Sequence, residues 1–172
     1  MSSPIRRVVT GKDEGGKAVV MIDAAASRVH ARRELGVTST VLWVTDAIPA
    51  RLSEQADAAN REFGVLPPPN GTIFRIVEFG PQSDVQVDDQ IRRQIFERMG
   101  LAPEAPSREL PRDPGMDRTR TLDYAVIPSG EMHMLLDEEV HLNAGDVVIQ
   151  RGTNHAWVNR GNQPCKIAFI FS

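Results

Sequence analysis

The chain has 172 residues and a formal net charge of −3 at pH 7, so it is long enough for one domain with a hydrophobic core and gives no basic footprint for nucleic acid. No apolar run approaches the roughly eighteen residues of a membrane span, and the opening segment MSSPIRRVVTGKDEGG lacks the apolar core of a signal peptide. The single cysteine, Cys165, cannot form an internal disulfide, so we expect a cytoplasmic protein in which Cys165 is a small core residue.

The N-terminal half is predicted to form strands that are joined by polar or proline-containing loops. A hairpin is expected at its start, because two short apolar runs flank the polar loop Gly11–Gly16. The stretch 24–36 has no clear pattern, and no special role is expected for its His30. Residues 46–70 are predicted to be an exposed excursion that ends in a proline-rich turn. Strand patterns occur at 5–10, 18–22, 38–45 and 72–79.

One amphipathic helix is predicted at 87–99. Ile91, Ile95 and Met99 recur at four-residue spacing and form an apolar stripe. Two aspartates favour the N-terminal end through the helix dipole, and Gly100 ends the helix. The following residues, 101–115, contain four prolines and are predicted to be an extended loop.

The C-terminal part of the chain predicts short strands separated by tight turns. Apolar and β-branched runs alternate with turn sequences that are rich in Gly, Pro, Asn and Asp. Strands this short and this regularly spaced are typical of an antiparallel barrel or a jelly roll. The predicted strands lie at 119–127, 131–136, 140–142, 147–150, 155–159 and 165–171. We expect one domain over 1–172, with a hairpin and extension at 1–36, loops at 46–70 and 101–115, and a barrel core at 115–171.

Two motifs in this core resemble those of the cupin superfamily. The segment GTNHAWVN, from Gly152 to Asn159, reproduces G-x2-H-x3-N, the end of the second cupin motif. In the first motif, Asp123 stands at the glutamate position and Gly130 follows at the required spacing. The two histidine positions of that motif fall on Asp117 and Thr119. The resemblance implies an all-β, cupin-type double-stranded β-helix, or jelly-roll barrel, with one peripheral helix and a degraded metal-binding motif.

Side chains alternate between the two faces of a strand, and the cupin resemblance places one face of each motif inside the barrel. We predict His155 and Asp123 as the catalytic pair, because a carboxylate beside an imidazole can orient it and tune its pKa for proton transfer. The predicted ligand-binding residues are Arg75, Asp117, Thr119, Thr121 and Trp157.

Cupins commonly hold a transition metal with three histidines and a glutamate, and at those positions His155 is the one histidine that remains. No cofactor is favoured, because a carboxylate and a hydroxyl replace two imidazoles. A divalent metal held by His155, Asp117 and Asp123 stays open as an alternative.

Arg75 interrupts an apolar strand, on the same face as Val77 and Phe79. It either binds an anionic substrate or forms a structural ion pair with an acidic residue such as Glu78 or Asp123. Both interpretations follow equally well from the sequence.

Other residues give narrower predictions. His133 lies between two methionines and His141 follows an acidic turn, so both are expected on the surface. Trp43 is expected in the core. Gly152 enters the strand of His155, and we predict a positive φ for it.

The leading functional hypothesis is a lyase or isomerase that acts on a small polar or aromatic metabolite by acid–base chemistry. The alternatives are a non-catalytic metabolite-binding or sensor cupin and a metal-dependent dioxygenase, because one fold can host all three. The expected partners are a small molecule and a second copy of the chain, with neither nucleic acid nor membrane. The homodimer would cover apolar residues of the N-terminal hairpin.

Overall fold

The computed structural model describes residues 3–52, 56–61, 64–82, 94 and 118–172. Apart from residue 94, the predicted helix 87–99 lies outside the described residues, as do the predicted loop 101–115 and Asp117. No helix in the described part of the chain combines the length and the apolar composition that a membrane crossing requires.

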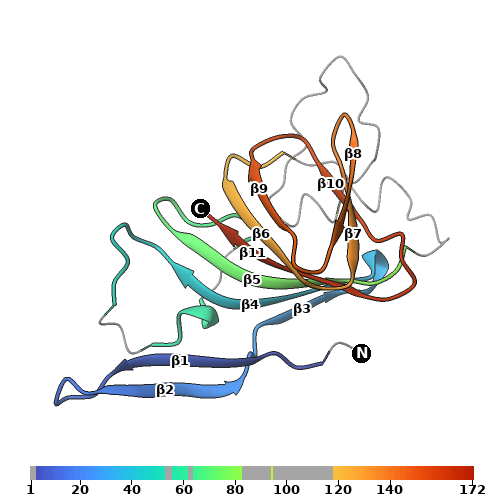
Figure 1. The fold of residues 1–172 in the computed structure, drawn as a ribbon. Coiled ribbons are helices and arrows are strands. Elements are labelled where there is room, and N and C mark those ends of the chain that lie inside the picture. Colours follow the sequence, from blue (N-terminus) through green and yellow to red (C-terminus); the bar gives the residue numbers. More distant parts are fainter. Residues whose placement is uncertain (1–2, 53–55, 62–63, 83–93, 95–117) are drawn as a thin grey trace.

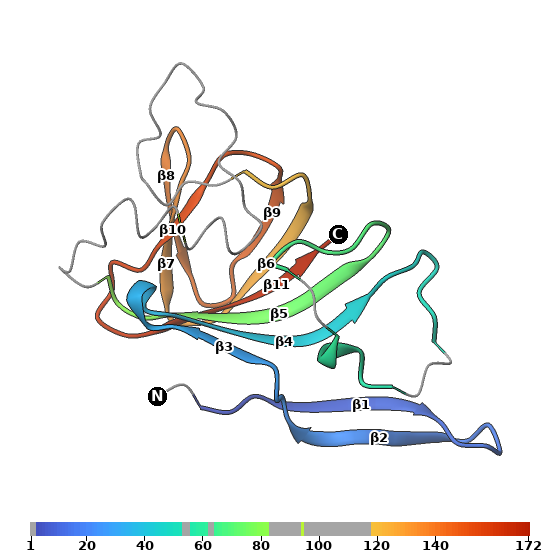
Figure 2. The same cartoon turned by 180° about the vertical axis from the view of Figure 1, so that it is seen from behind.

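The described residues form strands that pair antiparallel in three sheets. A six-stranded sheet has the order β3-β4-β5-β11-β6-β9, a three-stranded sheet has the order β10-β7-β8, and β1 and β2 form a separate hairpin (Figures 1 and 2). The elements are β1 (Arg6–Lys12), β2 (Ala18–Ala25), β3 (Val29–Arg32), the 3-10 turn η1 (Arg33–Leu35), β4 (Val37–Thr45), the 3-10 turn η2 (Ala58–Asn60), β5 (Thr72–Phe79), β6 (Leu122–Ser129), β7 (Glu131–Leu135), β8 (Glu139–Asn143), β9 (Val147–Arg151), β10 (Ala156–Val158) and β11 (Cys165–Phe171).

The hydrophobic core lies between the six-stranded and the three-stranded sheets. Side chains of alternating positions on β5, β6 and β11 face those of β7 and β8, as the pleat of a strand requires. The buried core residues are Val77, Ala125, Ile127, Met132, Met134, Leu142, Cys165, Ile167 and Phe169. Two antiparallel sheets packed around such a core form the cupin jelly roll that the sequence predicts.

Most of the predicted strands are confirmed, and two of them, 72–79 and 165–171, coincide with β5 and β11. The strand predicted at 119–127 begins later, at Leu122, and runs on through Pro128 to Ser129. The β6–β11 register shifts beside Pro128, so the proline, which has no N–H, does not interrupt a regular ladder. Gly130 then makes the turn with φ of 82°.

The pairing of β4 assigns one stretch that the sequence left open and corrects one prediction. The stretch 24–36, which has no apolar pattern, contains β3 because Val29–Arg32 pairs with the edge of β4. The prediction that Trp43 lies in the core is wrong. The register between β4 and β5 shifts between Val41 and Trp43, so Leu42 and Val44 are buried and Trp43 is half-buried on the other face.

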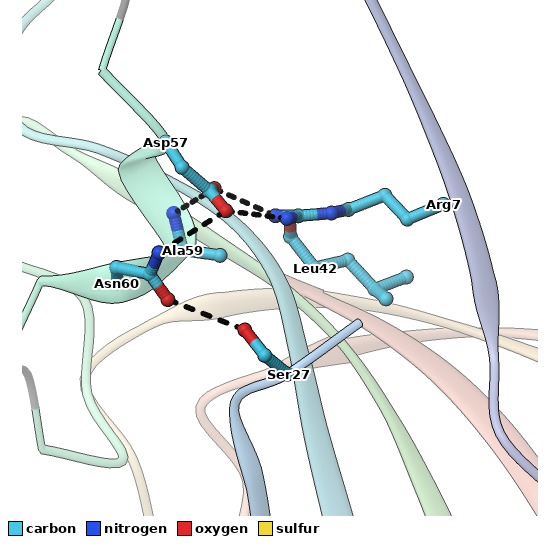
Figure 3. Close-up of polar contacts among 6 residues, drawn as sticks. All are labelled: Arg7, Ser27, Leu42, Asp57, Ala59 and Asn60. Carbon is cyan, nitrogen blue, oxygen red and sulfur yellow. Dashed lines mark hydrogen bonds and ion pairs between the residues drawn. The ribbon is translucent and has the colours of Figure 1, made fainter. Parts of the chain in front are cut away.

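The hairpin of β1 and β2 lies beside β4 and is attached to it by Arg7 (Figures 1 and 3). The Arg7 guanidinium donates to the Leu42 carbonyl at 2.9 Å and to both carboxylate oxygens of Asp57, at 2.8 and 2.5 Å. Asp57 also accepts from the Ala59 N–H at 3.0 Å, and so caps η2. Through this ion pair and hydrogen bond, Arg7 joins the hairpin to β4 and to the excursion that follows β4.

Candidate functional site

The predicted catalytic histidine immediately precedes β10 and contacts an aromatic side chain of that strand. His155 is 9% exposed, and its ring meets Trp157 edge-on, with centroids 5.8 Å apart. Trp157 in turn contacts Phe169 at 5.4 Å, and Phe169 stacks on Phe171 at 5.4 Å. The structure thus brings the predicted imidazole and indole together, at the start of a row of aromatic rings.

The Nδ1 atom of His155 has both a donor and an acceptor beside it. Gln150 Nε2 lies 2.9 Å from Nδ1, and the Thr153 carbonyl oxygen lies 3.0 Å from it. The orientation of the Gln150 amide is fixed, because its Oε1 accepts the Gly152 N–H at 2.8 Å. Nδ1 can therefore accept a hydrogen bond from Gln150 or donate one to Thr153, and either arrangement leaves Nε2 as the ring nitrogen for chemistry.

The predicted carboxylate lies on the strand next to Gln150, and no hydrogen bond joins it to His155 within the described residues. Asp123 is 2% exposed and is the cross-strand neighbour of Gln150. The Thr119 hydroxyl donates to Asp123 Oδ2 at 3.3 Å, and Thr121, half-buried, has a hydroxyl oxygen with no partner among the described residues. The groups that orient Nδ1 in the described structure are thus an amide and a carbonyl rather than a carboxylate.

Two other residues of the second motif serve the backbone. Gly152 has φ of 63°, as predicted, and a Cβ there would lie 3.0 Å from the Thr119 carbonyl oxygen. Asn159 donates to the Phe79 and Gln163 carbonyls at 2.9 and 2.8 Å, and accepts the Gly161 N–H at 3.0 Å. The motif therefore shapes the turns on either side of β10 and positions His155 between them.

A second polar region, the cationic cavity, lies over β3, β4 and β5. Its volume is about 110 Å³, and neither His155, Asp123 nor Trp157 lines it. Its polar lining is mainly basic: Arg28, His30, Arg32, Arg61 and Arg75, with Ser39 as a neutral member. Apolar side chains complete the lining: Val41, Val44, Val65 and Ile73.

Arg75 is the buried member of this group, with 6% exposure. Its guanidinium donates to the Val65 carbonyl at 2.8 Å and stands 5.2 Å from the Phe171 ring centroid. Burial, followed by the charge of Arg32, lowers the pKa of Arg75 to about 10, so the group still carries its charge at neutral pH. Of the two alternatives for Arg75, the ion pair with Glu78 or Asp123 does not occur in the described structure, where Glu78 faces Lys166 at 3.6 Å.

Sequence reasoning missed His30 and its two basic neighbours in the cavity. Arg28, His30 and Arg32 stand at every second position, which places them on one face of the strand that β3 forms. This alternation was the available signal. It was hidden because the stretch has no apolar face from which a strand could be predicted.

The remaining histidines and Cys165 lie where the sequence predicted them. His133 and His141 stack on the outer side of the three-stranded sheet at 4.6 Å, while Met132 and Met134 are buried. Cys165 is fully buried in the core. Burial, together with the charge of Glu131, raises the pKa of its thiol to about 11, so it stays protonated and is a poor nucleophile.

The described residues do not provide the ligand set that a metal of the cupin type requires. No group of three or more His, Cys, Asp or Glu side chains in this part of the chain is arranged to hold a metal ion. At two of the positions that correspond to ligands, Thr119 is engaged with Asp123 and Asp117 lies outside the described residues.

Comparisons with known proteins identify relatives along nearly the whole chain, although no family model matches it. The cupin-domain-containing oxidoreductase fogC of Aspergillus ruber is 27% identical over 98% of this chain and 72% of its own length. The cupin-domain-containing oxidoreductase srdD of Neurospora crassa is 26% identical, over 96% and 74%. Phomopsin biosynthesis cluster protein D of Diaporthe leptostromiformis is 28% identical, over 91% and 71%.

Solved structures with a similar chain path include a putative ethanolamine utilization protein of Salmonella typhimurium, with a TM-score of 0.43 and 9% identity over 99% of this chain and 97% of that one. An RmlC-like cupin of Shewanella frigidimarina has a TM-score of 0.41 and 12% identity, over 80% and 77%. The two packed antiparallel sheets agree with the cupin barrel that the sequence predicts, and so do the motif residues around His155. The chain is similar to cupin-domain-containing proteins along nearly its whole length.

Proposed function

We propose that this cupin is a small-molecule enzyme in which His155 carries a proton, in a reaction of the lyase or isomerase type. The observation that supports this most directly is the pair of groups at Nδ1. Because Gln150 can donate to that atom and Thr153 can accept from it, the site accommodates His155 with a proton on either nitrogen. Such an imidazole can take a proton at Nε2 in one step and return it in the next.

The surroundings of His155 suit a small polar or aromatic metabolite. Trp157 supplies a flat apolar surface next to the imidazole. Asp123 and Thr119 add a buried carboxylate and hydroxyl from the neighbouring strand, and the Thr121 hydroxyl is available as a further hydrogen-bonding group. Isomerisation, dehydration and decarboxylation of an activated acid need no more than such proton movement.

The names of two relatives favour a second candidate function. Both are called cupin-domain-containing oxidoreductases, and an oxidation would require a metal or another redox partner in addition to His155. A cupin that only binds a metabolite is the third candidate. The mass of the product separates the three.

The test uses purified protein and a panel of small hydroxy, keto and phenolic acids, with products identified by mass spectrometry. We expect a product that has lost water or carbon dioxide, or has kept its mass. His155→Ala should abolish its formation, while His133→Ala should have no effect, because His133 lies on the outer surface bonded to Glu139 at 2.7 Å. A product that has lost two hydrogens or gained oxygen would favour the oxidoreductase. No product at all would favour the binding protein.

The metal alternative needs its own arm of this experiment. We propose that turnover needs no tightly bound transition metal, so activity should survive dialysis against a chelator. Elemental analysis of the purified protein accompanies the assay. Near-stoichiometric metal that is lost together with activity in His155→Ala would overturn the proposal and favour a site formed by His155, Asp123 and Asp117.

We further propose that the chain forms a homodimer through its N-terminal hairpin. Val8 and Val20 are 49% and 57% exposed on the hairpin, although both are apolar. Light scattering should give a dimeric mass that becomes monomeric in Val20→Lys. Val147→Lys, on β9 and equally exposed at 60%, should leave the dimer intact. A monomeric wild type, or dissociation by Val147→Lys alone, would contradict this interface.

A further inference from the structure

The cationic cavity carries more positive charge than the described residues neutralise. Arg61 is paired with Asp46 at 2.6 Å. No carboxylate of the described residues forms an ion pair with Arg28, Arg32 or Arg75. Three guanidinium groups therefore face one small space without a counter-charge from this part of the chain, which is an unfavourable arrangement unless an anion enters.

The hydrogen-bonding state of Arg75 supports the same conclusion. Its guanidinium is one of the most deeply buried charges of the described structure, and its protein partners there are the carbonyls of Val65 and Gly64, at 2.8 and 3.4 Å. The Nε atom has no acceptor within the described residues. A guanidinium has five N–H donors, and a buried one that lacks acceptors loses free energy that a bound oxyanion would restore.

The shape and the remaining lining indicate which kind of anion fits. The cavity volume of about 110 Å³ is small compared with pockets for drug-sized ligands, which hold several hundred Å³. Val41, Val44 and Ile73 form an apolar part of the wall. An inorganic anion has no apolar surface to bury against these side chains, whereas the carbon chain of an organic acid does. The planar fork of Arg75 matches a carboxylate.

We propose that the cationic cavity is a binding site for a small organic acid, whose carboxylate is held by Arg75 and Arg32 and whose carbon chain contacts the valine and isoleucine side chains. His30 and Arg28 stand on the same side of β3 and add to the attraction. His155, Asp123 and Trp157 do not line this cavity; the link between the two regions is Phe171, which contacts Arg75 and ends the row of rings that begins at His155. The binding proposed here does not depend on the reaction proposed at His155.

The test is isothermal titration calorimetry on the full chain, at constant ionic strength in chloride, with three probes: succinate, butyrate and inorganic phosphate. We expect saturable binding of succinate and weaker binding of butyrate, which has one carboxylate fewer. Phosphate should bind more weakly than succinate. Arg75→Met and Arg32→Gln should each weaken succinate binding by at least about tenfold, because each removes a charged donor.

Two matched variants make the result specific. Arg33→Gln removes the same charge one residue further along the chain, and Arg33 is exposed and does not line the cavity, so succinate binding should change little. His155→Ala should also bind succinate as the wild type does, so that a failed reaction at His155 cannot be mistaken for a failed anion site. Should Arg75→Met not fold, the more exposed Arg32→Gln carries the test.

Three outcomes would overturn the proposal. The first is no saturable binding of either carboxylate. The second is binding that Arg32→Gln leaves intact, or that Arg33→Gln weakens as much, since both would indicate a general charge effect. The third is tighter binding of phosphate than of succinate, which would assign the cavity to a phosphate group instead.

Discussion

Arg7 and Arg75 are two largely buried arginines that the fold treats differently. Arg7, at the junction of hairpin and sheet, forms a two-point ion pair with Asp57 and a further bond to the Leu42 carbonyl (Figure 3). Arg75, in the cationic cavity, has backbone carbonyls and the face of Phe171. In both residues Nε has no acceptor among the described residues, so the difference lies in the charge partner.

The charge of Arg7 therefore has a structural role, whereas the charge of Arg75 is the one that we propose to bind a ligand. A buried ion pair with both partners present holds three segments of the chain in register, and removing either partner leaves a charge without compensation. In the cavity, Arg28, Arg32 and Arg75 already have no carboxylate partner among the described residues. Where the protein supplies both charge partners, mutation should change the stability and added anion should not. Where the partner is a bound anion, both mutation and added anion should have an effect.

The largest expected effect follows from breaking the complete pair. Asp57→Ala removes both the partner of Arg7 and the cap of η2, and should lower the free energy of unfolding by roughly 2 to 4 kcal/mol, measured by urea denaturation. Asp23→Ala is the matched control. It breaks the Arg6–Asp23 pair of the same hairpin, whose side chains are 73% and 47% exposed, and should change stability far less. Equal losses in the two variants would contradict a structural role for Arg7.

The turn at Gly152 is another region whose conformation needs no bound ligand. Gly152→Val combines a positive φ of 63° with a Cβ 3.0 Å from the Thr119 carbonyl oxygen, and should lower the free energy of unfolding by about 1 to 3 kcal/mol. Added succinate should not restore the loss beyond its effect on the wild type. Gly16→Val is the control, because Gly16 has φ of 79° but no atom near its Cβ position, and its loss should be smaller. An unfolding midpoint equal to wild type would refute the constraint at Gly152.

A smaller effect is expected from pH at the Arg7–Asp57 pair. The Arg7 guanidinium, through its hydrogen bonds, holds the pKa of the Asp57 carboxyl below its ordinary value of 3.8, against the opposing effect of burial. A carboxyl whose folded pKa is depressed stabilises the protein above the unfolded pKa, and that contribution is lost as the pH falls through the folded pKa. Wild-type stability should therefore fall more steeply below about pH 4 than that of Asp57→Asn. Parallel curves in urea titrations at several pH values would show that the pair makes no such contribution.

The sequence predicted the barrel well because its turns carry local signals. The second cupin motif was predictive for the same reason. Its glycine indicates a positive φ, which Gly152 has, and His155 follows at the spacing of the motif. The cavity could not be predicted in this way. It joins β3 to β5 and to the excursion at Arg61, and no local pattern states that these segments meet. The same holds for Arg7 and Asp57, which are 50 residues apart.

Trp43 and Asp123 show two other limits of sequence reasoning. A register shift in β4 turned Trp43 to the outer face. The alternation of side chains along a strand, on which the prediction rested, cannot anticipate such an extra residue. The same alternation did place Asp123 inside the barrel, where it is buried. It could not indicate that Gln150, the cross-strand neighbour of Asp123, would be the side chain that contacts His155 Nδ1.

The smallest expected effect is a change in the titration of His30, which reports directly on the charge of the cavity. Burial, and then the charges of Arg28, Arg32 and Arg75, lower the pKa of His30 below its ordinary value of 6.5; Arg61 also lines the cavity but is paired with Asp46. Removing a positive neighbour or adding an anion favours the protonated imidazole. The pKa of His30 should therefore rise in Arg28→Gln and, in the wild type, on saturation with succinate.

Carbon–proton NMR of the imidazole rings can follow this change, since the chain has four histidines and His30→Gln assigns the signal. Arg160→Gln is the control, because Arg160 pairs with Glu139 at 2.8 Å and does not line the cavity; it should leave the His30 titration unchanged. A titration that responds to Arg28→Gln but not to succinate would mean that the acid binds elsewhere. Arg7 and Arg75 would then still differ in their protein partners, but the proposal that the cavity binds an organic acid would be wrong.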